Sequence, residues 1–112
     1  MGVKIREVIN MSNKEFKDFL ETIVWRRMTI KQMEDVVNEF LGTTNKVRIV
    51  KSSINWNNLD IADYNLIGTT EEAYNENENL PFCDFDIYVL PTKERVGRNI
   101  VYYITEVGYV FE

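Results

Sequence analysis

The segment that decides the fold is MSNKEFKDFLETIVWRRMTIKQMEDVVNEFLG, residues 11–42, because it encodes the starts of two helices in succession. Ser12 and Glu15 have the spacing of a capping box, in which each side chain binds the backbone N–H of the other residue. Thr29 and Gln32 repeat the same spacing further along the segment. The repetition indicates two helices whose first backbone N–H groups are capped in the same way.

The apolar residues that follow each cap recur every three or four positions, as they do on the buried stripe of a helix. This pattern predicts helices over about residues 13–25 and 30–41. Gly42 stands where the C-terminal end of a helix favours glycine. The link between the helices, residues 26–29, is so short that it indicates a helical hairpin or a steep corner, and we adopt the hairpin.

Beyond Gly42 the apolar period changes from 3.6 toward 2, which is the period of a half-buried strand. Strands are predicted at residues 3–9, 46–51, 59–67, 84–90 and 99–111. Gly108 interrupts the last of these and predicts a bulge in one long curved strand. Thr69 and Glu72 fit a further capping box, which predicts a short helical turn.

The order of these elements defines the predicted fold class. No strand–helix–strand rhythm of about 30 residues occurs, so the sheet is expected to be mainly antiparallel. We predict a single α+β domain over residues 1–112, with two N-terminal helices packed as a hairpin on one face of a sheet of four to five strands.

Composition limits the class of protein. A length of 112 residues is typical of one domain, and an apolar content of 45% is too high for a disordered chain. The single cysteine, Cys83, cannot form an internal disulfide, and residues 1–6 have no apolar segment of the signal-peptide type. The longest apolar run, residues 100–104, is far shorter than the roughly 20 residues that span a membrane. We therefore expect a cytoplasmic protein that makes no membrane contact.

Charge is distributed unevenly along the chain. Residues 1–51 carry ten basic and seven acidic side chains, whereas residues 52–112 carry three basic and eleven acidic ones. Between Ser52 and Thr92 every charged side chain is acidic. Such a run repels itself unless it is solvated or meets cations. It predicts a negative surface that attracts basic partners and repels nucleic acid.

The candidate partner-binding residues are the acids of this run, together with tyrosines that we expect to be exposed. Carboxylates provide long-range attraction, and aromatic rings provide contact area. The set consists of Asp60, Asp63, Tyr64, Glu71, Glu72, Tyr74, Glu76, Glu78, Asp84, Asp86 and Tyr88. The alternative is an acidic surface that only keeps the protein in solution, although solubility alone favours interspersed charges of both signs.

The residue types disfavour most catalytic chemistry. The chain has no histidine and therefore lacks the commonest general base and metal ligand. Cys83 precedes Asp84, whose negative charge opposes formation of a reactive thiolate. An Asp-x-Asp pair is too small a set of ligands to define a calcium or magnesium site, and no glycine-rich phosphate loop occurs. We therefore expect a protein that is not an enzyme and has no catalytic residues, metal or cofactor.

These observations favour a small acidic protein-binding module that docks on a basic, nucleic-acid-handling protein. An inhibitor of the immunity or phage anti-defence type, from a phage or a bacterium, has this charge and size; the likeness is an analogy only. One alternative is a structural homo-oligomer that assembles through residues 99–111, which carry more aromatic residues than one small core face needs. The other is a nucleic-acid-binding protein that uses residues 25–27 and 93–98.

Residues 25–27, Trp-Arg-Arg, are the most basic point in the chain and have two interpretations. An aromatic ring beside two arginines can stack on bases and hold phosphates. The arginines also suit the negative C-terminal end of a helix, where Trp25 can cover the edge of the core. We favour the second interpretation and expect no direct contact with nucleic acid, because the net charge of −5 opposes it.

Overall fold

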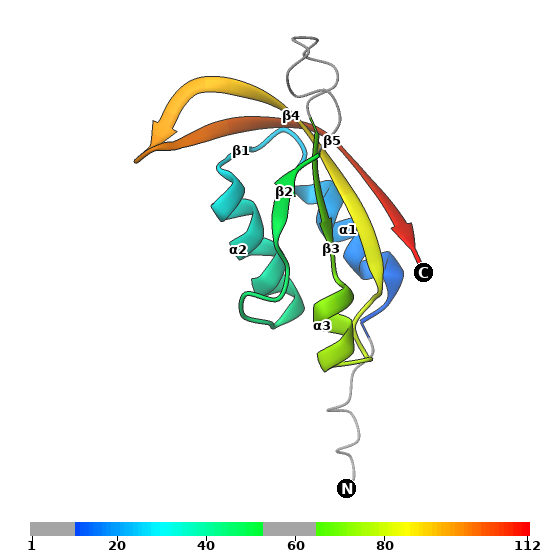
Figure 1. Cartoon of the computed structure of the whole chain (residues 1–112). Coiled ribbons are helices and arrows are strands. Elements are labelled where there is room, and N and C mark those ends of the chain that lie inside the picture. The colour runs from blue at the N-terminus through cyan, green and yellow to red at the C-terminus, as the bar shows by residue number, and fades with distance from the viewer. Residues whose placement is uncertain (1–10, 53–64) are drawn as a thin grey trace, which may run out of the picture.

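The structure is a computed structural model that describes residues 11–52 and 65–112. The strand predicted at residues 3–9 and most of the one predicted at 59–67 lie outside these ranges. In chain order the elements are α1 (Asn13–Thr22), β1 (Arg27–Met28), α2 (Ile30–Leu41), β2 (Ile49–Lys51), β3 (Asn65–Thr69), α3 (Glu71–Glu76), β4 (Cys83–Val96) and β5 (Asn99–Phe111). Figure 1 shows α1 and α2 beneath a long arch that β4 and β5 form together.

The described strands form one antiparallel sheet in the order β1-β5-β4-β3-β2. This arrangement confirms the predicted α+β class and the antiparallel sheet. The short link between α1 and α2 contains β1, which was not predicted. Arg27 lies opposite Tyr103 of β5, and Met28 lies opposite Tyr102, so the link itself extends the sheet by one short edge strand.

Both predicted capping boxes are present at the two N-terminal helices. The Ser12 hydroxyl accepts a hydrogen bond from the Glu15 N–H at 3.1 Å, and the Glu15 carboxylate accepts one from the Ser12 N–H at 2.8 Å. Thr29 and Gln32 make the same pair of bonds at the start of α2. Gly42 ends α2 in the left-handed conformation, with φ = 73°. Local sequence therefore determines three of these four helix ends, whereas α1 ends at Thr22, earlier than predicted.

The core combines buried side chains of the helices with buried side chains from one face of the sheet, which we call the inner face. Phe16 of α1 contacts Phe85 of β4 edge to face, with 6.0 Å between the ring centroids. The helices bury Phe16, Leu20, Met33 and Val37, and the strands bury Leu66, Phe85, Ile87 and Ile104. Burial of one such side chain contributes about 1.5–3 kcal/mol to stability.

Gly68 in β3 allows Phe85 to lie across the neighbouring strand. Gly68 and Phe85 face each other in the antiparallel register. A Cβ atom on Gly68 would lie 2.5 Å from Cζ of the Phe85 ring, far closer than the roughly 3.5–4.0 Å of a normal carbon contact. The absence of a side chain at residue 68 is thus a packing requirement of the core.

The β4–β5 pair bends before it projects beyond the rest of the sheet. The register shifts between Tyr88 and Val89, which face Glu106 and Ile104, so Thr105 is the extra residue of a bulge. The predicted bulge at Gly108 is wrong, because Gly108 faces Asp86 in regular register. A bulge requires one extra residue in one of the two strands, and this residue is Thr105 and not Gly108.

A second irregularity separates the end of this pair from the sheet. The register shifts again between Pro91 and Arg95, and the two strands close in a turn where Val96 faces Asn99. Gly97 has φ = 62° at the first turn position, as a type II′ turn requires. We call residues 92–101 the hairpin arm; it projects to one side of the molecule in Figure 1.

Candidate functional site

Thr70 fixes the segment that carries most of the predicted acidic residues. It connects β3 to α3 and has no exposed surface. Its hydroxyl donates a hydrogen bond to the Pro81 carbonyl at 2.6 Å and accepts one from the Cys83 N–H at 2.9 Å. The Thr70 N–H also donates to the Cys83 carbonyl at 2.9 Å. These bonds hold the beginning of α3 against the beginning of β4.

The capping box predicted for Thr69 and Glu72 does not form. The N-cap of α3 is Thr70, and its side chain makes no capping hydrogen bond because it is committed to Pro81 and Cys83. Thr69 instead accepts a hydrogen bond from the Glu71 N–H at 3.2 Å. The helical turn itself was predicted, but tertiary hydrogen bonds replace the expected local one.

Side chains on β4 alternate between the two faces of the sheet, as the sequence predicts. Phe85 and Ile87 point to the inner face, whereas Asp84 and Asp86 lie on the opposite, outer face. Asp84 is exposed and Asp86 is half-buried. The Asn65 amide donates a hydrogen bond to Asp86 at 3.2 Å, which positions this carboxylate without neutralising its charge.

The structure places the remaining predicted residues in different environments. Asp60, Asp63 and Tyr64 lie outside the described residues. Tyr74 is half-buried and stacks on Phe82 at 5.1 Å, so part of its ring serves local packing. Tyr88 is half-buried on the outer face, opposite Asn65. The acids of α3 and the following turn, Glu71, Glu72, Glu76 and Glu78, are all exposed.

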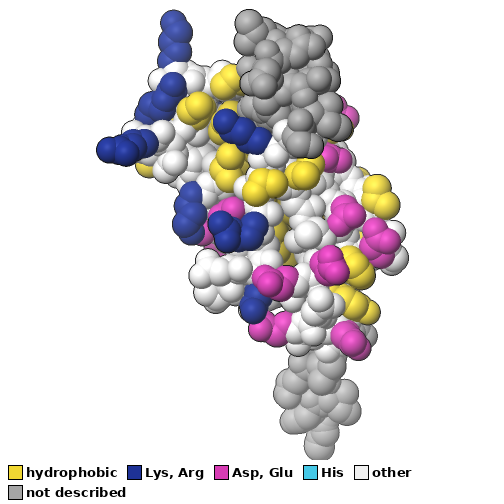
Figure 2. All heavy atoms as spheres, viewed as in Figure 1, with side chains coloured by type: hydrophobic (Ala, Val, Ile, Leu, Met, Phe, Trp, Pro, Cys, Tyr) yellow, Lys and Arg dark blue, Asp and Glu magenta, His cyan; other side chains and the backbone are white. Residues whose placement is uncertain are grey.

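These four glutamates, with Asp84 and Asp86, form what we call the acidic face. Figure 2 shows acidic side chains over α3 and the adjoining part of the sheet, whereas basic side chains lie both toward the hairpin arm and in the middle of this view. Within residues 11–52 and 65–112, Glu76 is the one member of the acidic face that forms an ion pair, with Lys46 at 3.2 Å. The other five carboxylates therefore contribute an uncompensated negative potential.

Sequence reasoning missed an apolar hollow beside Asp84 and Asp86. The hollow has a volume of about 500 Å³ and lies on the outer face, across β2 to β5. Val50, Ile67 and Val110 line it and are 52%, 39% and 64% exposed, respectively. Exposed aliphatic side chains gathered over several strands are a feature of interaction surfaces.

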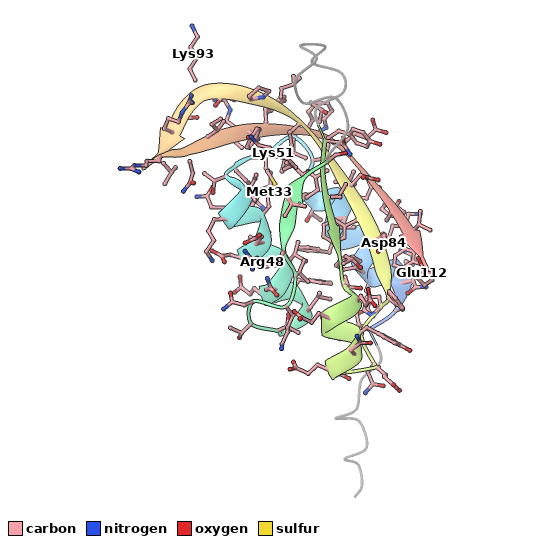
Figure 3. The ribbon with its side chains drawn as sticks, viewed as in Figure 1. Met33, Arg48, Lys51, Asp84, Lys93 and Glu112 are labelled. Carbon is pink, nitrogen blue, oxygen red and sulfur yellow. The ribbon has the colours of Figure 1, made fainter. Side chains whose placement is uncertain are left out.

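One rim of the hollow is acidic and the other is basic. Figure 3 labels Asp84 on β4 and Arg48, which directly precedes β2, and both residues line the hollow. The Arg48 guanidinium lies 3.6 Å from the Glu34 carboxylate of α2. Within the described residues, Arg48 forms no ion pair with Asp84 or Asp86. The apolar floor therefore has carboxylates beside it that no arginine of the described chain neutralises.

Cys83 lies next to the acidic face but is chemically inert there. Its side chain is buried, and this burial raises the pKa of the thiol to about 12, with a smaller contribution from the negative charge of Asp84. The thiol therefore stays protonated near neutral pH. Among the described residues, no three potential metal-ligating side chains form a group.

The described helices include none that is long and apolar enough to cross a membrane. Comparisons with protein-family models, with curated proteins and with solved structures find no match to this chain. The function must therefore be inferred from the surface itself.

Proposed function

We propose that this protein is a small acidic binding module whose acidic face docks on a basic surface of another protein. The observation that carries the proposal is that five of the six described carboxylates on this face have no ion-pair partner within the described chain. Such a potential accelerates the approach of a cationic partner and disfavours anionic ones.

The apolar hollow provides the short-range part of the interaction. Charges at a rim contribute mainly to association rate, whereas buried contacts near the centre of an interface carry most of the affinity. An arginine or lysine of the partner fits the hollow best. Its aliphatic stem would cover Val50, Ile67 and Val110, and its charged end would reach Asp84 or Asp86.

The proposal assumes that α1 and α2 cover only the inner face, so that the outer face stays accessible to the partner. Basic surfaces of the required kind occur on nucleic-acid-handling proteins, because those surfaces bind phosphates. We therefore infer an inhibitor that occupies such a surface, of the immunity or phage anti-defence type, acting in the cytoplasm. The protein needs no catalytic residue, metal or cofactor for this role.

The test compares three forms of the protein as immobilised baits for extracts of its host. The wild type should retain a protein with a basic surface at 50 mM salt and release it at 500 mM salt. The double variant Asp84→Asn/Asp86→Asn should retain much less of this protein, because each substitution keeps the shape of the side chain and removes its charge. Glu39→Gln removes one exposed carboxylate of α2, outside the acidic face, and should behave like the wild type.

The retained protein must then be purified and its affinity measured directly. Loss of two steering charges should weaken binding at low salt by at least tenfold, mainly through slower association. Equal affinity of the wild type and the double variant, or affinity that is constant from 50 to 500 mM salt, would contradict the proposal.

A homo-oligomer built through β5 is the second candidate function. Residues 105–111 of β5 pair with β4, and no other described strand occupies their opposite edge. An open edge of this kind can pair with a second copy. However, Tyr102 is buried, and the Phe111 ring lies 6.5 Å from that of Phe16, so these aromatic residues already serve the protein's own packing.

Light scattering after size-exclusion chromatography separates the two candidates. Assembly through β5 predicts a mass that rises to at least twice the monomer value as concentration increases. A mass that stays at the monomer value up to about 100 μM excludes a homo-oligomer with micromolar affinity.

A further inference from the structure

Trp25 has a backbone conformation that side chains disfavour. It follows α1 with φ = 72°, and its N–H donates a hydrogen bond to the Ile104 carbonyl at 2.7 Å. Glycine is the usual residue at such a left-handed position after a helix, because a Cβ atom crowds the backbone there. A tryptophan at this position indicates that the indole ring is needed for another reason.

The indole does not serve the core. Trp25 is 65% exposed, so the interpretation that it covers the core edge is wrong. The favourable effect of arginines on a helix end is also not realised, since α1 ends at Thr22 and its last turn contains no basic residue. Arg26 and Arg27 follow in the extended segment that becomes β1, and both are exposed.

A second aromatic ring and a cation lie beside Trp25. The rings of Trp25 and Tyr103 are 5.9 Å apart between centroids, at an angle of 43°. The Arg27 guanidinium lies 5.9 Å from the Tyr103 ring centroid, which is within the range of a cation–π contact. The α1–β1 link and β5 thus present two aromatic rings and an arginine together at the edge of the sheet.

The hairpin arm adds basic side chains to this group. Arg27 approaches Glu94 of the arm at 3.4 Å, which connects the two regions. Figure 3 shows that Lys93 extends outward from the arm, and Arg98 is exposed at its tip. Arg95 donates hydrogen bonds to the carbonyls of Thr92 and Glu94, which hold its guanidinium without neutralising it. We call this surface the basic end: Trp25, Arg26, Arg27, Tyr103 and the charged residues of the arm.

We propose that the basic end binds single-stranded nucleic acid. Bases would stack on Trp25 and Tyr103, and phosphates would contact Arg27 and the cations of the arm. Trp25 is exposed and Tyr103 is half-buried. Aromatic rings among cations are the combination that recognises unpaired bases, because each base has a planar face and each nucleotide carries one negative charge. A duplex keeps its bases stacked on one another and offers no such face to the rings.

The net charge of −5 disfavours the binding of nucleic acid by the protein as a whole, but it does not disfavour binding at the basic end. The basic end has five basic side chains and one carboxylate, Glu94, whereas the acidic face lies toward the other end of the sheet (Figure 2). Salt screens exposed charges beyond about 8–10 Å near physiological ionic strength. Nucleic acid at the arm therefore meets mainly the local positive charge.

The test uses fluorescein-labelled oligo(dT) of 12 nucleotides and measures its fluorescence anisotropy with the full-length protein, starting at about 100 mM salt, where charges beyond about 10 Å are screened. Trp25→Asn should weaken binding by about 5- to 150-fold, the range for loss of one stacked base, and asparagine tolerates the left-handed conformation. If about four phosphates are neutralised, affinity should fall about sevenfold for each doubling of salt concentration. Lys93→Ala should make this salt dependence less steep, by about one phosphate contact.

Two controls and a set of contrary results complete the experiment. Asp84→Asn/Asp86→Asn should bind the oligonucleotide no more weakly than the wild type, so the acidic face and the basic end are tested separately. Circular dichroism should show that Trp25→Asn is folded. The proposal is overturned if wild-type protein fails to bind oligo(dT), or if Trp25→Asn binds it equally well. It is also overturned if poly-glutamate or duplex DNA competes as effectively as the single strand, since simple charge attraction would then explain the binding.

Discussion

The close approach of Phe85 to Gly68 predicts that Gly68→Ala destabilises the protein strongly. The added Cβ atom would lie 2.5 Å from Cζ and 2.9 Å from Cε2 of the Phe85 ring. A normal carbon contact is roughly 3.5–4.0 Å, so the ring must retreat by about 1 Å or more. It cannot move into solvent, because Phe85 is 2% exposed and packs against Phe16.

Overpacking of this kind costs about 1–3 kcal/mol, and we expect a value near the upper limit. A shift of the ring away from Gly68 also disturbs its contact with Phe16 of α1. Alanine in place of glycine has a compensating benefit of about 0.4–1 kcal/mol through the unfolded chain. The net loss should therefore be about 2 kcal/mol.

Gly108 provides a matched control in the same sheet. A Cβ atom on Gly108 would have its nearest neighbour, Oδ2 of Asp86, at 3.9 Å, which is an ordinary contact. Gly108→Ala should therefore be neutral or stabilise the protein by up to about 1 kcal/mol. Urea unfolding followed by circular dichroism gives the free energy of unfolding of each variant.

A second substitution tests the mechanism itself. Phe85→Leu alone should cost about 1 kcal/mol, because a smaller side chain leaves a small cavity. In the Gly68→Ala background the shorter side chain relieves the clash, so the double variant should be at least as stable as Gly68→Ala. Strictly additive losses, or equal losses for Gly68→Ala and Gly108→Ala, would refute the reasoning.

Further outcomes follow from the packing of three other residues, Thr70, Cys83 and Trp25. Thr70→Val removes the hydroxyl that serves Pro81 and Cys83 and should lower the free energy of unfolding by about 2–4 kcal/mol, whereas Thr70→Ser keeps both bonds and should cost about 1 kcal/mol in the same urea experiment. The buried thiol of Cys83 should react with iodoacetamide only as fast as the protein unfolds; a rate equal to that of a free peptide thiol would contradict its burial. Burial raises the pKa of Cys83 from 9.0 to about 12, so the thiol ionises first in the unfolded chain. Stability should therefore fall as pH rises from 9 toward 12, and Cys83→Ala should make this alkaline loss smaller. Trp25→Gly relieves a disfavoured φ but removes the contact with Tyr103, so the free energy of unfolding should change little. A loss of more than about 2 kcal/mol would show that the indole is a core residue.

Features that depend on neighbours in the sequence were predictable. The capping boxes at Ser12 and Thr29 form because each needs only residues within one helical turn. The alternation along β4 likewise depends on local geometry, and it placed Asp84 and Asp86 on the outer face correctly. The exposure of Glu71, Glu72, Glu76 and Glu78 agrees with the polar composition of their segment. That the acids of this region bind a partner stays a prediction.

Features that depend on distant residues were not predictable. Strand β1 has only two residues and exists because Arg27 and Met28 meet β5, about 75 positions away in the chain. The hollow requires aliphatic residues from β2, β3 and β5 to gather, and no single strand carries that pattern. The exposure of Trp25 depends on the hydrogen bond to Ile104 that turns the chain away from α1.

The acidic face and the hairpin arm lie at different parts of the sheet, so charge is distributed asymmetrically over the molecule in addition to its net charge (Figure 2). The field of any strongly charged object therefore exerts a torque on the protein while the two are still apart. The protein is then partly oriented before it collides with the object, so that fewer encounters occur in unproductive orientations. The speed with which this protein finds a target should thus exceed what a uniformly charged body of the same size achieves, even where the final affinity is ordinary.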